Sequence, residues 1–469
     1  MKRIASLIIF VMLATILAAC GQAESTSNAV TAEPAGGGAA EASPAAASPA
    51  AADASPAAAG GGTSAAGDTG CTPSAAQVDK LTFWTRATEG DPEYPALQQL
   101  AADYQAATNT PVEVVTIPDA DFRSKMSISA PAGEGADVFG PVAHDWVGEF
   151  AIQKIAQPIP ADAIPAKDDI IQAALDAATV DGQLYALPLF VESVALLYNK
   201  DMVPNPPTTW DELVKTSTDL TADGKYGFGF PLLEQYHEGP FFNGFGSYIF
   251  KYENGQFDVN DIGLNNAQGV EAAKFLRDMY HKQQPSMPEA ALDRQNMHTV
   301  QEGMMEAGEL AMTINGPWRE GRLKEAGINY GVAKLPTLPN GEPMRPFLGV
   351  QVFAASAYSK NAEAALDFIK FATCTDNAVK LYQGFNKVPV RTSAVESDVI
   401  KANPNIAIWN EQAADGVPMP NIPAMSNVWT PWGNAMDVII GQNASDEEIQ
   451  QALDAAVEQI KEAIKQTQG

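Results

Sequence analysis

The chain is predicted to fold as an α/β protein because strand-like and helix-like segments alternate after residue 77. A strand, a helix, a strand, a helix and a strand follow one another at residues 80–84, 97–104, 112–116, 122–130 and 137–139. This alternation is typical of a parallel sheet with helices on both faces. Ligands of such sheets bind beyond the carboxyl ends of the strands, so residues 85–91 and 141–146 are expected to matter most. The folded part, residues 77–469, is long enough for two or three lobes.

Later segments carry their own strand and helix signals. Residues 195–200 form an apolar run typical of a buried strand, and Thr209 with Glu212 predicts a capping box at the start of the next helix. An apolar stripe over residues 365–372 predicts another helix. The last helix is expected to begin at Ser445 and to bury one face. The residues of that face are Ile449, Leu453, Ala456, Ile460 and Ile464.

The N-terminus is typical of a secretory signal. It starts with Met1-Lys2-Arg3 and continues with an apolar run over residues 4–19, which is shorter than the about 20 residues needed to cross a bilayer. Residues 17–20, Leu-Ala-Ala-Cys, look like a bacterial lipoprotein box. We therefore expect residues 1–19 to be removed and Cys20 to be acylated, so that only the lipid touches the membrane. The alternative is an ordinary export signal with a spare cysteine.

Residues 20–75 are predicted to be a disordered, lipid-anchored tether. From residue 21 onward this segment is almost wholly Ala, Pro, Ser, Gly and Thr, a composition that cannot fill a core. A flexible coil of that length reaches roughly 40 Å root-mean-square. The folded part is therefore expected to be extracytoplasmic and held at the cell membrane, on its outer face or in the periplasm.

The composition excludes several classes of partner. The net charge is −28, from 29 basic and 57 acidic residues, and such a chain would repel the phosphates of nucleic acid. The four histidines and the two cysteines beyond Cys20 show no metal-ligand spacing, so neither a metal nor a cofactor is expected. Outside the cell, Cys71 and Cys374 are candidates for a disulfide that ties the base of the tether to the folded body.

Trp318 is expected to lie at the end of a strand. The β-branched, apolar run 311–315 stops at Asn-Gly-Pro, and Trp318 follows directly. A Gly-Pro stop forces the backbone to turn, so the ring is held at the mouth of the sheet. A flat ring in that place suits the apolar face of a sugar, although a tryptophan that only covers a core is the simpler alternative.

Five segments of the folded part carry a family resemblance. They are residues 197–207, 249–255, 311–318, 329–337 and 418–423. With them the sequence resembles the maltose/maltodextrin-binding proteins, the extracellular solute-binding receptors of ABC sugar importers. The resemblance covers nearly all of the folded part. It implies a monomeric binding protein that is not an enzyme, with an oligosaccharide as ligand and the ABC permease subunits as partners.

The resemblance also implies a fold of two α/β lobes, of the type II periplasmic-binding-protein class, that close on sugar about hinge strands. Lobe 1 is expected at residues 76–190 and 349–376, and lobe 2 at residues 191–348 and 377–469. The hinge crossings are expected near residues 187–194, 347–352 and 373–377.

Stacking rings and hydrogen-bonding carboxylates are the side chains that such a site requires, because each carboxylate oxygen accepts strong bonds from hydroxyls. By motif match, the sugar contacts of the family correspond to Asp145, Glu192, Glu234, Tyr236, Trp318 and Trp429. After the first strand, Arg86, Glu89 and Asp91 are further candidate partners for sugar hydroxyls.

Three positions depart from the family pattern. The aromatic residue expected before Ala-His-Asp is Val142, the arginine expected after it is Trp146, and the arginine expected after the last stacking tryptophan is Gly433. Trp146 and Trp432 are new aromatic residues near the site and are counted among the candidates. The shift from guanidinium to aromatic groups leaves maltose, trehalose, sucrose and other α-linked oligosaccharides open as ligands.

Three rival functions remain at this point. Glu192 and Glu234 would be the acid and the base of a glycosidase if they faced each other across a substrate. A receptor for a peptide or a metal complex would not need the tryptophans. A surface adhesin would explain the tether and leave the cleft residues unexplained.

Overall fold

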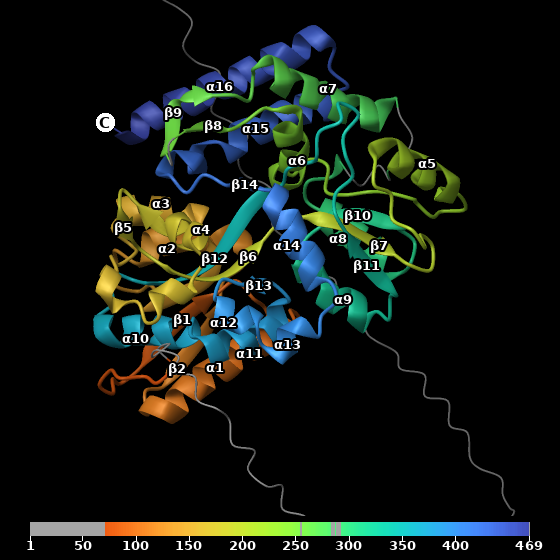
Figure 1. Cartoon of the computed structure of the whole chain (residues 1–469). Helices are drawn as coiled ribbons and strands as arrows, with labels where there is room; N and C mark the ends of the chain where they lie inside the picture. The colour runs from red at the N-terminus through yellow and green to blue at the C-terminus, as the bar shows by residue number, and fades with distance from the viewer. Residues whose placement is uncertain (1–70, 254–255, 283–286, 288–291, 469) are drawn as a thin grey trace, which may run out of the picture. The chain divides into compact units, whose positions relative to one another are not determined.

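The computed structural model describes residues 71–468 apart from 254–255, 283–286 and 288–291 (Figure 1). The predicted signal peptide, the lipidation of Cys20 and the tether as far as residue 70 lie outside the described residues. Within the described part, no helix combines the length and the apolar character that a membrane crossing requires.

The first sheet has seven strands, and its middle strands are almost wholly buried. The strands are β1 (Leu81–Thr85), β2 (Val112–Thr116), β3 (Val138–Ala143), β6 (Leu187–Glu192), β12 (Phe347–Ala355), β13 (Val388–Pro389) and β14 (Val417–Pro418). Their order is β13-β6-β12-β3-β1-β2, with β14 paired to β12. The strand β1 runs parallel to β2 and β3, whereas β12 runs antiparallel to β3 and β6. The predicted α/β fold with a parallel sheet is thus confirmed, and antiparallel strands extend it.

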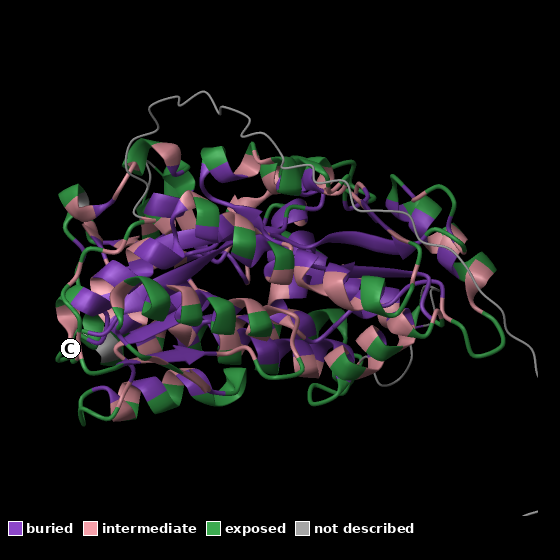
Figure 2. Cartoon of the chain, turned by 90° about the horizontal axis from the view of Figure 1, so that it is seen from below, coloured by how far each residue is buried: buried purple, intermediate pink, exposed green. Residues whose placement is uncertain are grey.

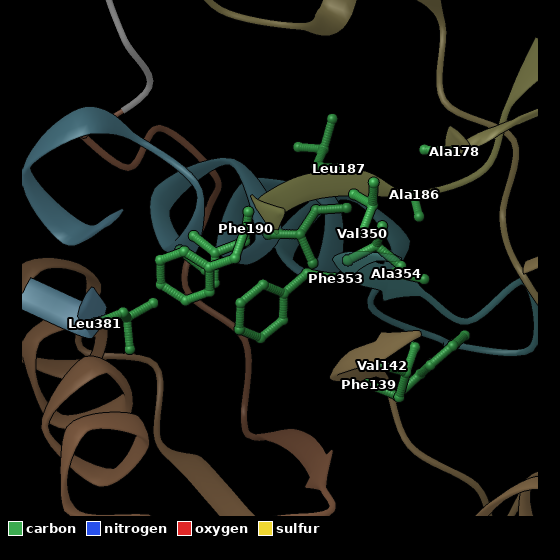
Figure 3. Packing of buried hydrophobic residues seen from close by; sticks show 14 of the residues in the cluster. Phe139, Val142, Ala178, Ala186, Leu187, Phe190, Val350, Phe353, Ala354 and Leu381 are labelled. Atoms are coloured by element: carbon green, nitrogen blue, oxygen red, sulfur yellow. The ribbon is translucent and has the colours of Figure 1, made fainter. Parts of the chain in front are cut away.

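Helices cover this sheet and bury their apolar faces on it, while their outer faces are exposed (Figure 2). They are α1 (Glu93–Thr108), α2 (Asp119–Ser129), α3 (Asp145–Ile152), α4 (Gln172–Ala177), α10 (Ala362–Ala372), α11 (Thr375–Phe385), α12 (Thr392–Val395), α13 (Asp398–Lys401) and α14 (Ile406–Asp415). Phe190 of β6, Phe353 of β12 and Leu381 of α11 belong to one buried cluster (Figure 3). A short hairpin, β4 (Thr179–Val180) and β5 (Gln183–Leu184), follows α4.

The second sheet has three antiparallel strands, in the order β10-β7-β11. They are β7 (Ala195–Asn199), β10 (Met312–Asn315) and β11 (Tyr330–Ala333), and a separate hairpin joins β8 (Phe250–Glu253) to β9 (Gln256–Ile262). The surrounding helices are α5 (Trp210–Leu220), α6 (Gln235–Phe245), α7 (Ala267–His281), α8 (Met297–Glu306), α9 (Glu320–Glu325), α15 (Trp429–Met436) and α16 (Asp446–Gln468). The predicted capping box of Thr209 and Glu212 begins α5.

The chain passes between the two sheets three times. The strand β6 leads through Ser193 into β7, and β12 returns from Phe347 in the second buried cluster to Val350 in the first. The third passage follows α14, because Trp409 lies in the first cluster and Met419 in the second. The expected crossing at residues 373–377 is therefore wrong.

The segment after residue 377 stays with the first sheet for a physical reason. The helix α11 packs on α1, and Phe385 at its end packs against Phe190 of β6, with 5.4 Å between ring centroids. The next strand, β13, pairs with β6. The apolar face of α11 is thus buried on the first sheet, so residues 377–409 differ from the expected assignment to lobe 2.

The start of the described chain is fixed to α10 and to the residue directly before α11. Cys71 is joined to Cys374 by a disulfide, 303 residues apart in sequence. Next to it, the N–H of Ser74 donates to Asp367 Oδ1 at 2.9 Å. The first described residues are therefore attached to the helices of the first sheet.

The double variant Cys71→Ser, Cys374→Ser is expected to lower the free energy of unfolding by about 2–4 kcal/mol. Without the cross-link, the unfolded chain has more conformational entropy. Urea unfolding in oxidising buffer measures this loss. Reduced wild-type protein is the control and should match the variant. Equal urea midpoints for the variant and the oxidised wild type would contradict the expectation.

Candidate functional site

Glu192 lies at the end of β6, where the chain leaves the first sheet. Its Oε1 accepts a hydrogen bond from Gln351 Nε2 at 2.5 Å, and its Oε2 forms a salt bridge of 2.6 Å with Lys387 Nζ. Burial raises the pKa of this carboxyl, but the charge and hydrogen bond of Lys387 and the bond from Gln351 outweigh burial, so the pKa is lowered overall. Glu192 is therefore an ionised acceptor in a nearly dry place.

Gly349 leaves space for Tyr236 of α6 to approach this carboxylate. It pairs directly with Glu192 across β6 and β12. A Cβ atom on Gly349 would lie 3.0 Å from Glu192 Cγ and 3.1 Å from the hydroxyl of Tyr236. A larger residue would push these two side chains apart, so the glycine is what lets an acid and a phenol meet.

Tyr236 lies in the first turn of α6 and is half-buried. Its ring centroid is 6.4 Å from that of Trp318. Burial raises the pKa of the Tyr236 hydroxyl, and the negative charges of Glu192, Glu234 and Asp145 raise it further. The pKa of this one hydroxyl thus responds to three of the predicted acids.

Trp318 follows β10 in a short 3₁₀ turn, Pro317–Arg319. A Cβ atom on Gly316 would lie 2.0 Å from the ring of Trp318, so only glycine allows the ring to fold back over the end of the strand. The ring is partly exposed, and Lys387 Nζ lies 5.4 Å from its centre. The turn that the sequence predicts thus holds Trp318 beside the Glu192 salt bridge.

Trp429 begins α15 and joins the same group from another direction. Its Nε1 donates to Asp145 Oδ2 at 3.3 Å, and its ring centroid is 6.4 Å from that of Phe347. Burial raises the pKa of Asp145, while the charges of His144 and Arg123 oppose this rise. Acids and rings therefore come from β6, α3, α6, α15 and the turn after β10.

Two predicted aromatic residues lie in the core instead. Trp432 is fully buried, with its ring centroid 5.0 Å from that of Phe242, and stacks parallel to Trp429 at 6.4 Å. Trp146 is 8% exposed and packs against Phe122. Both were expected to face a ligand, but Trp432 lies behind the partly exposed ring of Trp429 and Trp146 packs among buried rings.

Glu234 is turned toward its own helix. Its carboxylate accepts hydrogen bonds from the N–H groups of Tyr236 at 3.3 Å and His237 at 3.1 Å, and it also contacts His237 Nδ1. It is therefore the N-cap of α6. Both carboxylate oxygens of Glu234 are therefore engaged by the first turn of its own helix.

The loop after β1 contributes one of its three candidates to the Glu192 network. Arg86 Nη2 donates to Gln351 Oε1 at 3.1 Å, which links Arg86 to Glu192 through the amide. Asp91 accepts two bonds from Thr88, at 2.7 and 2.8 Å, and so folds the loop itself. Glu89 is exposed, and its side chain makes no hydrogen bond or ion pair within the described residues.

Guanidinium groups from other segments lie near both positions, Trp146 and Gly433, at which the family has an arginine. Arg86 and Arg123 place their Cζ atoms 5.2 and 5.7 Å from the ring centre of Trp146. Arg294 Nη2 donates to the carbonyl of Gly433 at 2.8 Å, and a Cβ atom on Gly433 would lie 3.1 Å from that nitrogen. The positive groups are therefore supplied from other segments.

Lys387 and Gln351 are site residues that the sequence analysis missed. Gln351 is the lone strongly polar side chain in the apolar strand β12, and that contrast would have marked it. Lys387 directly follows Asn386, which ends α11 in a left-handed conformation, and no local pattern connects it with Glu192. In the described part of the chain, no group of three metal-binding side chains is found.

A partly buried polar cluster adjoins Glu234. The rings of His237 and His298 are 5.6 Å apart, and Arg319 forms a salt bridge of 3.0 Å with Glu302. Burial lowers the pKa of His298 to about 4, and the charges of His237 and Arg319 lower it while that of Glu234 opposes them. In the folded protein His298 therefore stays neutral down to a much lower pH than a free histidine, whose pKa is about 6.5.

Stability should consequently fall as the pH is lowered from about 6.5 toward about 4, because the unfolded chain binds a proton at His298 before the folded chain does. The variant His298→Gln is expected to lose less stability over this range, by on the order of 2 kcal/mol. Urea unfolding of both proteins at pH 7 and pH 4.5 measures the difference. Parallel pH profiles for wild type and variant would contradict it.

The comparisons with known proteins agree with this geometry. Residues 99–408 match the family model of the bacterial extracellular solute-binding proteins. A galactooligosaccharide-binding protein of Bacillus subtilis is 32% identical and covers 84% of this chain and 91% of its own length. A maltooligosaccharide ABC transporter solute-binding lipoprotein of Streptococcus pneumoniae is 29% identical, over 84% of this chain and 91% of its own.

A solved structure gives the same result. The maltotriose-binding protein of Thermus thermophilus, bound with maltotriose, superposes with a TM-score of 0.73 at 34% identity, and the match covers 82% of this chain and 100% of that one. The two-lobed fold and the role of a binding protein, as opposed to an enzyme, follow from these matches. The chain belongs to the bacterial extracellular solute-binding protein family.

Proposed function

We propose that this protein is the extracytoplasmic substrate-binding lipoprotein of an ABC importer and that it captures maltodextrin-type oligosaccharides between its two lobes. The observation that carries the proposal is the ionised carboxylate of Glu192 beside the partly exposed rings of Trp318, Tyr236 and Trp429. Flat rings stack on the apolar face of a pyranose, and a buried carboxylate accepts bonds from its hydroxyls.

The relatives support this class of ligand. Their names refer to maltooligosaccharide, maltotriose and galactooligosaccharide binding. The galactooligosaccharide-binding relative makes a galactose-containing oligomer the second candidate ligand. Its identity to this chain, 32%, lies between the 29% and 34% of the two other relatives. Trehalose and sucrose remain candidates of lower rank.

The proposed partners follow from the same role. Cys20 carries the lipid that holds the monomer at the membrane, and the permease subunits recognise the ligand-closed form. A ligand favours closure only through contacts that the open form lacks. Trp318 and Trp429, which flank the second sheet, together with Glu192 on the first sheet, are the groups proposed to make those contacts.

A calorimetric titration with maltose, maltotriose, trehalose, sucrose, glucose and a galactooligosaccharide tests the proposal, and the tightest binding is expected for maltotriose. Trp318→Ala should weaken that binding by at least the roughly 1 kcal/mol of an aromatic contact. Tyr252→Ala, an exposed aromatic in the β8–β9 hairpin, is the control and should bind as wild type does. An unchanged affinity of Trp318→Ala would remove this ring from the site.

A further inference from the structure

Lys387 is a buried amine with an unusual set of neighbours. The residue is 7% exposed, and its Nζ lies 2.6 Å from Glu192 Oε2. An ammonium group loses much of its hydration in such a place, which is costly unless partners replace the water. One carboxylate contact uses one of its three N–H groups, so two donors remain for other partners.

Aromatic rings lie beside the same ammonium group. Its Nζ is 5.4 Å from the ring centre of Trp318 and 5.9 Å from that of Phe385. Trp318 belongs to the turn after β10 of the second sheet, whereas Glu192 ends β6 of the first. Lys387 therefore connects the acid of one sheet with the ring of the other.

The acceptor side of this pair is held in a fixed orientation. Arg86 Nη2 donates to Gln351 Oε1 at 3.1 Å, which turns the amide nitrogen of Gln351 toward Glu192 Oε1. Oε1 of Glu192 thus accepts one hydrogen bond within the protein, whereas Oε2 is enclosed beside Lys387 and accepts none, so each oxygen keeps acceptor capacity. A rigid carboxylate with spare acceptor sites lies directly beside an ammonium with spare donors.

Further charged groups lie around the pair. Glu93 at the start of α1 faces Lys387, and burial raises the pKa of its carboxyl while the charge of Lys387 opposes that rise. Arg86 acts on both Glu93 and Glu192. Arg86 also pairs with Asp119, so each of the two positive groups here has an acidic partner.

We infer that Lys387 and Glu192 form a donor–acceptor pair that binds two adjacent hydroxyls of the sugar unit stacked on Trp318. One hydroxyl accepts from Lys387 Nζ, and its neighbour donates to Glu192. Adjacent hydroxyls of a pyranose offer this combination side by side, so the pair selects the configuration of the ring at those two carbons. The inference rests on the proposed oligosaccharide function and names a specificity residue for it.

A purely structural role for Lys387 makes a different prediction. If Lys387 only kept Glu192 ionised and in place, its removal would matter only while Glu192 is present. The variants Lys387→Met, Glu192→Gln and the double variant separate the two cases in titrations with maltotriose. We expect Lys387→Met to weaken binding about tenfold or more, in the wild type and again in the Glu192→Gln background.

Lys380→Met is the matched control, because Lys380 lies on α11 and pairs at the surface with Asp103 at 2.8 Å. It should bind maltotriose as wild type does. Monodeoxy analogues of maltotriose provide a second test that needs no variant to fold. Loss of one of the two hydroxyls should weaken binding to wild type about tenfold, and the hydroxyl bound by Lys387 should no longer matter in Lys387→Met.

The outcomes separate the two proposals. A wild-type protein that binds none of the sugars overturns the proposed function. A wild type that binds maltotriose while Lys387→Met binds it equally well overturns only the role of Lys387. If Lys387→Met weakens binding only while Glu192 is present, a direct contact between Lys387 and the sugar is also overturned.

Discussion

A buried carboxylate at the point where the chain leaves the first sheet is the constraint on which this site depends. Glu192 cannot remain ionised away from water unless partners replace its hydration. Lys387 and Gln351 supply those partners, and Gly349 leaves the space that the side chains need. The same requirement draws together β6, β12 and the end of α11, which lie far apart in sequence.

The strands that carry the site also carry the connection between the lobes. His144 shows how tightly these parts are joined: the N–H of Val350 donates to its Nδ1 at 3.0 Å, so its proton lies on Nε2, which donates to the carbonyl of Met419 at 3.1 Å. These two bonds link His144, which directly follows β3, to β12 and to the third passage between the sheets.

The local features of the site could be predicted from the sequence. The turn at Gly316, the capping box at Thr209 and the alternation of strands with helices each depend on neighbours in the chain. The N-cap role of Glu234 was also within reach, since an acid directly before a helix commonly caps it.

The features that the sequence could not supply arise from long-range packing. Lys387 meets Glu192 only because α11 stays on the first sheet, and Arg294 reaches Gly433 from a segment that carries no motif. The burial of Trp146 and Trp432 is decided by residues on other helices. A pattern of residue types marks a ring as present but does not decide which side of a core it faces.

The crystal structure of the complex with maltotriose tests the central claim most directly. The account predicts the sugar against the rings of Trp318, Tyr236 and Trp429, with one hydroxyl hydrogen-bonded to Glu192. A sugar bound elsewhere, or a Glu192 that touches only protein while maltotriose is bound, would contradict it.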